Sequence, residues 1–250
     1  MQPLDAPMLH QGRPGVSLFR RKRLRPSRFW LEQEIADFAQ RLPAGSAVLD
    51  AGAGHQPYRH HFVHCHYESA DFEMVNKAYA QSTYICDLTQ IPVEDGRFDA
   101  IVFSQVMEHL PDPLAVLKEL HRVLKPGGVL FYSGPLWFEE HEKPYDFYRY
   151  TRFALRHLFE KSAFQVEDLR WLEGYLGSVT LQLKTMIKGL PYSPRAYGGG
   201  IAGILIFLLA LAFRPVARLL AYSFAYADRQ FRYTERGYPI NYLAIVRRPA

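Results

Sequence analysis

Short apolar runs alternate with amphipathic segments along most of this chain. Each run is as long as a strand that is buried on both faces. The predicted strands are residues 47–49, 67–70, 83–86, 100–103, 129–132, 164–169 and 242–246. Helices are predicted between them, and two have clear limits. One carries apolar residues from Leu114 to Leu124 and ends before Pro126, and the other covers residues 152–161. Alternating strands and helices predict a doubly wound α/β sheet.

A first helix precedes this alternation. Trp30, Ile35, Phe38 and Leu42 recur at helical spacing, and Ser27 is the expected N-cap. Residues 1–26 hold prolines and glycines beside a basic run, so we expect a flexible basic arm there. The run consists of Arg20, Arg21, Lys22, Arg23, Arg25 and Arg28.

Residues 176–237 interrupt the alternation and form an apolar insert between residues 27–175 and 238–250, which make up the predicted domain. No charged residue occurs between Arg195 and Arg214, and this length approaches the roughly 20 apolar residues of a membrane span. A single crossing would separate the last strand from its sheet. A helical hairpin with residues 217–226, or an in-plane helix, keeps both ends together. A buried helix lining a lipidic or aromatic pocket is the alternative.

Composition narrows the function classes only slightly. The chain has 250 residues and 48% hydrophobic content, enough for one α/β core with appendages. The formal charge of +5 comes largely from the basic run, so nucleic acid is not expected as a partner. Cys65 and Cys86 have no CxxC spacing, which argues against a disulfide framework or a zinc site and fits the cytoplasm. A secretory signal is not expected, because an amphipathic pattern follows the basic run.

An acid and two glycines follow the first predicted strand, as Asp50, Gly52 and Gly54. Glycines at a strand-to-helix turn let the backbone approach a ligand closely. The third glycine of a dinucleotide fingerprint is replaced by Pro57, which makes a nicotinamide or flavin site less favoured. Asp71 lies about 20 residues further on, the spacing at which an acid meets ribose hydroxyls, although it could also be a solvated strand end.

Several motifs together resemble the type 11 group of class I S-adenosylmethionine-dependent methyltransferases. They are residues 48–54, 86–88, 98–102, 105–109 and 122–128. The resemblance covers residues 46 to about 170. It implies a Rossmann-like, seven-stranded mixed sheet of order 3-2-1-4-5-7-6, here with the apolar helical insert before the last strand. It also implies that S-adenosylmethionine binds at the carboxyl end of the first strand, with Gly52 and Gly54 facing the methionine part.

The resemblance extends to a set of cofactor-binding residues. They are Asp50, Gly52, Gly54, Arg59, Asp71, Asp87, Leu88 and Gln105. Asp87 is expected at the adenine edge, or as the cap of the turn before Ile91. Relatives more often carry a third glycine or a small residue after Gly54, whereas residues 55–59 here resemble a subgroup with a Pro-Tyr-Arg signature. Arg59 is expected to pair with the cofactor's carboxylate, or to be a surface arginine.

Methyl transfer needs an aligned acceptor and, for a poor nucleophile, a base. His109 follows the fourth strand, as a catalytic group or as a hydrogen-bonding residue that shapes the loop. Some relatives bind a divalent metal through two acids and a histidine there, but Gln105 replaces the first acid, so we expect no metal. His141 is the candidate base, with Asp146 orienting it or the acceptor.

The remaining acceptor-side residues belong to the aromatic loop of residues 141–150. Tyr148, Arg149 and Tyr150 are expected to bind the substrate, and Arg149 would meet an anionic group. Alternatively, the tyrosines pack beneath the loop and Arg149 pairs with Asp146.

The expected function is therefore methyl transfer from S-adenosylmethionine to a small-molecule, lipid or glycan acceptor. Two alternatives stay open, a cofactor-binding module without turnover and a nucleic-acid methyltransferase that uses the basic arm. We expect a cytoplasmic protein that contacts the cytoplasmic face of a membrane through residues 199–227 and the basic arm.

Overall fold

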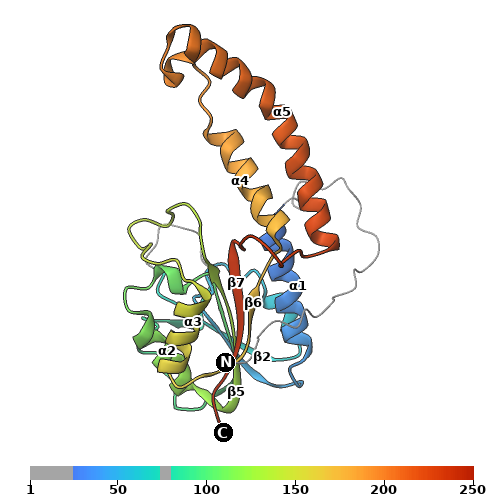
Figure 1. Cartoon of the computed structure of the whole chain (residues 1–250). Helices are drawn as coiled ribbons and strands as arrows, with labels where there is room; N and C mark the ends of the chain where they lie inside the picture. Colours follow the sequence, from blue (N-terminus) through green and yellow to red (C-terminus); the bar gives the residue numbers. More distant parts are fainter. Residues whose placement is uncertain (1–24, 74–79) are drawn as a thin grey trace. The chain divides into compact units, whose positions relative to one another are not determined.

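A computed structural model describes residues 25–73 and 80–250 (Figure 1). The flexible basic arm that the sequence predicts falls almost wholly in residues 1–24, outside the described residues. Of its basic run, the structure describes only Arg25 and Arg28. The chain divides into two compact units. Among the described residues, one comprises Trp30–Leu172 with Ile240–Ala250, and the other comprises Glu173–Pro239 with residues 25–29.

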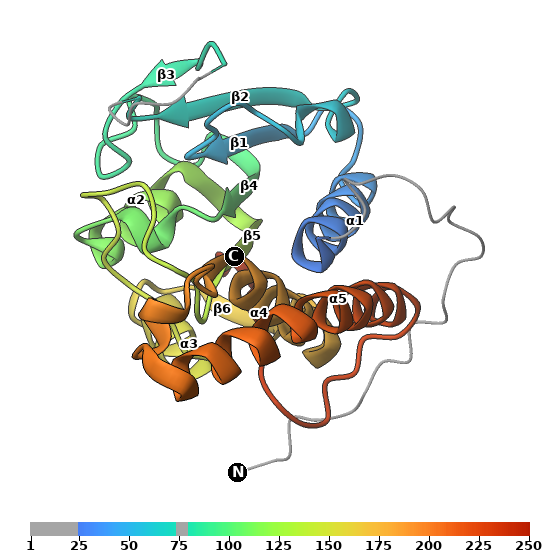
Figure 2. The same ribbon diagram turned by 90° about the horizontal axis from the view of Figure 1, so that it is seen from above.

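A seven-stranded sheet forms the first unit, in the order β3-β2-β1-β4-β5-β7-β6. The succession of β3, β2, β1, β4 and β5 can be followed in Figure 2. The expected fold is thus confirmed. The strands are β1 Ala47–Ala51, β2 His66–Asp71, β3 Tyr84–Ile85, β4 Phe98–Ser104, β5 Leu124–Pro135, β6 Gln165–Trp171 and β7 Asn241–Arg247. Strands β1 to β5 pair in parallel, whereas β7 is antiparallel to both β5 and β6. The carboxyl ends of the parallel strands therefore meet at one edge, where ligands bind in such sheets.

Helices cover both faces of the sheet. The buried residues of α1 (Pro26–Gln40), including Ile35 and Phe38, share one core cluster with β1, β4 and β5. The buried residues of α2 (Pro113–Val123) and α3 (Arg152–Lys161) belong to the other cluster. Asp112 and Thr151 cap α2 and α3 by accepting hydrogen bonds from backbone N–H groups of their first turns.

Two predicted helix limits were wrong. Helix α1 begins at Pro26, so Ser27 lies inside its first turn rather than at the N-cap; proline is favoured at the first helical position because its missing N–H needs no partner there. Leu124 belongs to β5 and not to the preceding helix, because it pairs with Phe98 across a bulge. Tertiary pairing thus extends β5 back through the Pro-Gly-Gly segment.

The second unit is built around a helical hairpin. It contains α4 (Tyr175–Gly189), a short 3₁₀ turn η4 (Pro194–Tyr197) and α5 (Gly200–Gln230). Helices α4 and α5 pack against each other, and Ala217, Ala221 and Ala225 are buried at intervals of four residues along α5. Small side chains at this spacing let two helix backbones approach closely, and the Thr180 hydroxyl lies 3.4 Å from the carbonyl oxygen of Ala221.

Two expectations for this insert were therefore wrong. Residues 217–226 continue the same helix as residues 201–213, so the partner in the hairpin is α4. Helix α5 continues through Pro215, and the alanine-lined face of α5 packs on α4. The buried-helix alternative also fails for the described chain, because only 17% of the most apolar 18-residue stretch of α5 is buried.

Candidate active site

The loop after β1 requires glycine at Gly52. This residue has φ +77°, and its N–H donates to the carbonyl oxygen of Ala70 at 2.8 Å. A Cβ atom there would lie 2.4 Å from Cγ2 of Val106, far inside van der Waals contact. At Gly54 a Cβ would meet nothing within 4 Å, so the space in front of this backbone is open. The loop therefore has the shape that a ligand in contact with backbone needs.

Two carboxylates flank this loop. Asp50 is buried and accepts a hydrogen bond from the Tyr67 hydroxyl. Burial raises the pKa of Asp50 to about 6, with the Tyr67 hydrogen bond opposing and the charge of Asp71 adding to the shift. Asp71 accepts from the N–H of Gly54 at 2.8 Å and from that of Glu73 at 3.0 Å. Because a carboxylate offers about four lone pairs, Asp71 keeps acceptor capacity for a ribose.

The other predicted cofactor residues on this side take part in local structure. Asp87 is exposed and accepts from the N–H and the hydroxyl of Thr89, so it caps its own turn, and Leu88 is buried beside it. The guanidinium of Arg59 lies 5.6 Å from the centre of the Tyr67 ring and borders a hollow of about 250 Å³. Their contacts with a cofactor stay predictions.

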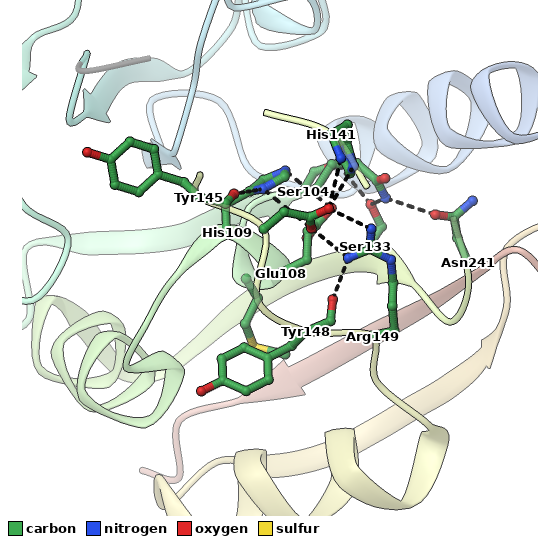
Figure 3. A network of polar contacts seen from close by, with 12 residues as sticks. Ser104, Glu108, His109, Ser133, His141, Tyr145, Tyr148, Arg149 and Asn241 are labelled. Atoms are coloured by element: carbon green, nitrogen blue, oxygen red, sulfur yellow. Dashed lines mark hydrogen bonds and ion pairs between the residues drawn. The ribbon is translucent and has the colours of Figure 1, made fainter. Parts of the chain in front are cut away.

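A hydroxyl and amide network lies where β4 and β5 end and β7 begins (Figure 3). The Gln105 side chain donates to the Ser133 hydroxyl and to the side-chain oxygen Oδ1 of Asn241, each at 3.2 Å, and the hydroxyls of Ser104 and Ser133 are 2.8 Å apart. Gln105 itself has φ +58°. Sequence reasoning missed Ser133 and Asn241, because only the pairing of β5 with β7 brings Asn241 to Gln105.

Glu108 is the most unusual group of the site. It lies in the 3₁₀ turn η3 (Met107–His109), its side chain is 1% exposed, and neither carboxylate oxygen has a hydrogen-bond partner among the described residues. Burial raises its pKa to about 8, although the charge of Arg149 opposes the shift. Its backbone carbonyl accepts from Phe147 and Tyr148, so η3 also anchors the 141–150 loop. Glu108 is not among the site residues that the sequence analysis predicts.

This pKa has a consequence for stability. Between the ordinary pKa of glutamate and about 8, folded Glu108 holds a proton that the unfolded chain releases, so the free energy of unfolding falls as pH rises. We expect the parent to lose about 2 kcal/mol more than Glu108→Gln between pH 6 and pH 8. Urea unfolding at both pH values, with EDTA present, measures the difference. Equal losses in the two proteins would show that Glu108 ionises normally.

Two imidazoles lie next to Glu108 (Figure 3). Nε2 of His109 is 3.9 Å from Oε1 of Glu108, while its Nδ1 hydrogen-bonds with the carbonyl oxygen of Tyr145. The ring of His141 stands edge-on to that of His109, with centroids 4.7 Å apart. Nδ1 of His141 lies 3.1 Å from the carbonyl oxygen of Glu139 and 3.5 Å from Asp146. A proton held on this Nδ1 leaves Nε2 as an unprotonated base.

Asp146 holds the loop in shape. Its Oδ2 accepts from the backbone N–H of His141 at 2.8 Å, and both its oxygens pair with Arg149, at 2.7 and 2.9 Å. Arg149 keeps the pKa of Asp146 well below its usual range. The internal Arg149–Asp146 pair is thus present.

Tyr150 is buried and donates to the carbonyl oxygen of Met107, whereas Tyr148 is exposed and donates to that of Pro111. Substrate contacts of these residues stay predictions.

The cluster also offers ligands for a cation. One ligand atom each from Glu108, His109 and His141 lie within 4.8 Å of one another, and Glu32, His60 and His61 form a second such group. Two imidazoles and one carboxylate suit zinc or iron(II). The sequence analysis expected no metal, because Gln105 replaces the first acid of the metal-binding relatives, and it did not consider His141 as a ligand.

Comparison with known proteins identifies the family. A family model described as a methyltransferase domain matches residues 19–175, well over half of the chain. The chain belongs to this family, and its sheet, glycine loop and motifs make it a class I S-adenosylmethionine-dependent methyltransferase of the type 11 group. Membership of this family implies S-adenosylmethionine as the methyl donor.

Curated relatives match only part of their own length. The chain is 35% identical to an arsenite methyltransferase of Aquipseudomonas alcaligenes over 38% of this chain and 27% of that protein. It is 27% identical to a ubiquinone biosynthesis O-methyltransferase of Acinetobacter baumannii over 42% of this chain and 48% of that protein. The chain thus spans between about a quarter and a half of these relatives.

Solved structures share the fold at low identity. The [4+2]-cyclase SpnF aligns with a TM-score of 0.56 at 17% identity, over 97% of this chain and 87% of that chain. The phosphoethanolamine N-methyltransferase 2 of Haemonchus contortus, in complex with S-adenosyl-L-methionine, gives 0.52 at 16% identity, over 88% and 52%. These likenesses establish the fold alone.

Proposed function

We propose that the chain methylates a hydroxyl group of a small-molecule, lipid or glycan acceptor in the cytoplasm, with His141 as the general base. The observation that carries this proposal is the position of His141, whose Nδ1 faces two oxygen atoms while its ring lies against His109 above the buried Glu108. A hydroxyl is a weak nucleophile that gains from a base, and the ubiquinone biosynthesis relatives are named as O-methyltransferases.

The residues around β1 suit the proposed donor. The open space before Gly54 fits a ligand that touches backbone, Asp71 retains lone pairs for ribose hydroxyls, and Gln105 lies at the end of β4. Asp50, Gly52, Arg59, Asp87 and Leu88 complete the proposed binding set. S-adenosylmethionine supplies a methyl group on a positively charged sulfur, which makes the methyl carbon electrophilic.

On the acceptor side, His141 takes the proton of the acceptor hydroxyl on Nε2. The oxygen then forms the bond to the methyl carbon while the bond from that carbon to sulfur breaks, and sulfur keeps the electron pair. Asp146 supports this role because it fixes the backbone of His141 and favours the imidazolium that results. Arg149 holds Asp146 ionised throughout. His109, Tyr148 and Tyr150 are proposed to shape the acceptor pocket.

The proposal is tested in two stages with the full chain. Calorimetry with S-adenosylmethionine and S-adenosylhomocysteine should show binding of both, and labelled-methyl transfer into fractionated cell extract should then identify the acceptor fraction. Binding of neither compound would contradict a functional donor site. Binding without transfer to any fraction would favour a module that has lost turnover, and the SpnF fold shows that a protein named as a cyclase can share this architecture.

Metal removal distinguishes general-base catalysis by His141 from a metal-assisted mechanism. If His141 acts as a free base, dialysis against EDTA should leave methyl transfer unchanged, and metal analysis of the purified protein should find less than one equivalent of any transition metal. A loss of activity that zinc, manganese or iron(II) restores would instead assign Glu108, His109 and His141 as ligands, and would contradict the base.

A further inference from the structure

The α4–α5 hairpin carries positive charge and no negative charge over most of its length. Between Gly174 and Ala227 the sequence contains no Asp or Glu. The same stretch contains Lys184, Lys188, Arg195, Arg214 and Arg218. Repulsion from Arg25 and Lys188 adds to burial in lowering the pKa of Lys184, so these cations lie close enough to affect one another. Such a one-sided charge suits an anionic surface.

Helix α5 also exposes an unusual amount of apolar surface. Ile201, Leu205 and Leu209 lie four residues apart, on one side of the helix, and are 80%, 57% and 70% exposed. Other exposed apolar residues of α5 are Ile204, Ile206, Leu208, Leu211, Phe213, Val216, Leu219 and Leu220. A continuous apolar surface of this kind, beside cations, is typical of helices that bind the boundary between lipid headgroups and acyl chains.

One arginine stabilises the hairpin and is not part of its exposed surface. Arg214 is buried, donates to the carbonyl oxygens of Leu190 and Pro191 at 2.7 and 3.0 Å, and stacks 3.8 Å from the centre of the Tyr192 ring. It therefore ties α5 to the end of α4. Lys188 and Arg218 are exposed, and half-buried Lys184 joins them as a candidate for contact with phosphate groups.

Helix α5 is long and apolar enough to cross a membrane by length and composition, but the positions of the charges and the pairing of the flanking strands argue against a crossing. The charge-free part of α5, residues 200–213, spans about 21 Å at 1.5 Å per residue. Helix α4 spans about 22 Å and contains Lys184 and Lys188. Both are shorter than the hydrocarbon core of roughly 30 Å. The strands on either side of this segment are paired, Trp171 with Tyr242, so the chain leaves and re-enters the sheet at neighbouring positions.

We propose that the α4–α5 hairpin docks on one leaflet of an anionic phospholipid bilayer, with the apolar side chains of α5 in the acyl boundary and Lys184, Lys188 and Arg218 at the phosphates. Membrane docking adds an interaction surface to the proposed function and does not depend on methyl transfer. Long basic side chains reach headgroups while their methylene stems cover apolar surface.

Vesicle sedimentation tests the docking. The full chain is mixed with vesicles of phosphatidylcholine alone, or with one quarter phosphatidylglycerol, at 50 and 500 mM NaCl. We expect binding to the anionic vesicles that weakens at high salt. The variant Lys184→Gln/Lys188→Gln/Arg218→Gln should bind them about 100-fold more weakly, at about fivefold per cation. Ile201→Gln/Leu205→Gln/Leu209→Gln should lose at least about tenfold on both vesicle types.

A matched control replaces exposed apolar residues outside the α4–α5 hairpin. Val63 and Phe153 are 85% and 72% exposed in the other unit, and Val63→Gln/Phe153→Gln should bind vesicles like the parent. Circular dichroism checks that all variants keep their helices. Equal binding to neutral and anionic vesicles would overturn the proposed charge contact. Failure to bind either, with a dimer in light scattering that the α5 variant disperses, would show that the apolar face joins two copies of this chain.

Discussion

Replacing Gly52 with valine is expected to weaken binding of S-adenosylhomocysteine by at least about 1,000-fold, which calorimetry would record as no detectable binding. Two effects combine. The residue has φ +77°, where a β-branched side chain is strongly disfavoured, and its Cβ would lie 2.4 Å from Cγ2 of Val106. Since Val106 lies just after β4, the loop itself must move, and the backbone proposed to contact the cofactor moves with it.

Gly45 provides a matched control for this substitution. It also has a left-handed backbone, with φ +80°, but nothing lies within 4 Å of its Cβ position and it precedes β1. Gly45→Ala should therefore cost about 1 kcal/mol of stability and leave cofactor binding intact. A Gly52→Val protein that is folded by circular dichroism and binds the cofactor normally would show that this loop is not the donor site.

Replacing His141 with alanine is expected to lower the rate of methyl transfer by about 100- to 10,000-fold, the range typical for loss of a general base. The dissociation constant of S-adenosylhomocysteine should stay within about twofold of the parent value. This separation is expected because, among the described residues, the contacts of His141 are with Glu139, Asp146 and neighbouring rings rather than with the β1 loop. Single-turnover transfer to the identified acceptor, together with calorimetry, measures both quantities.

His157 serves as the comparison for His141. It is exposed on α3, and His157→Ala should keep full turnover. Asp146→Asn should lower the rate less than His141→Ala does, since it removes the charge beside His141 but retains a side chain that can accept from the backbone N–H. If His141→Ala retained the parental rate, the base would have to be sought among the other groups at this edge.

Local sequence signals alone carry the prediction for the donor side of the site. Asp50, Gly52, Gly54 and Asp71 lie within about 20 residues of one another, on β1, β2 and the loop between them. The turn chemistry of glycine and the spacing of the acids are visible in one short segment. Their spatial arrangement follows from parallel pairing of two consecutive strands, which the pattern predicts directly.

The acceptor side depends on distant contacts. His109 and His141 are far apart in the sequence, yet their rings are in edge contact, and Asn241 reaches Gln105 from the last strand. The burial of Glu108 could not be predicted either, because an acid after a strand is usually solvated. Its isolation comes from the loop that closes over η3, in which Phe147 and Tyr148 donate to its backbone carbonyl.

By itself, the sequence indicated the class of this protein through short motifs, and the resemblance carried by those motifs implied the order of the strands. The loop for the methyl donor stays a prediction from the same motifs. The tertiary structure decided that α5 is one continuous helix paired with α4, and that Glu108, His109 and His141 meet at one edge of the sheet. Both results depend on packing between segments well separated in the chain, and such packing leaves no periodic signal in either segment.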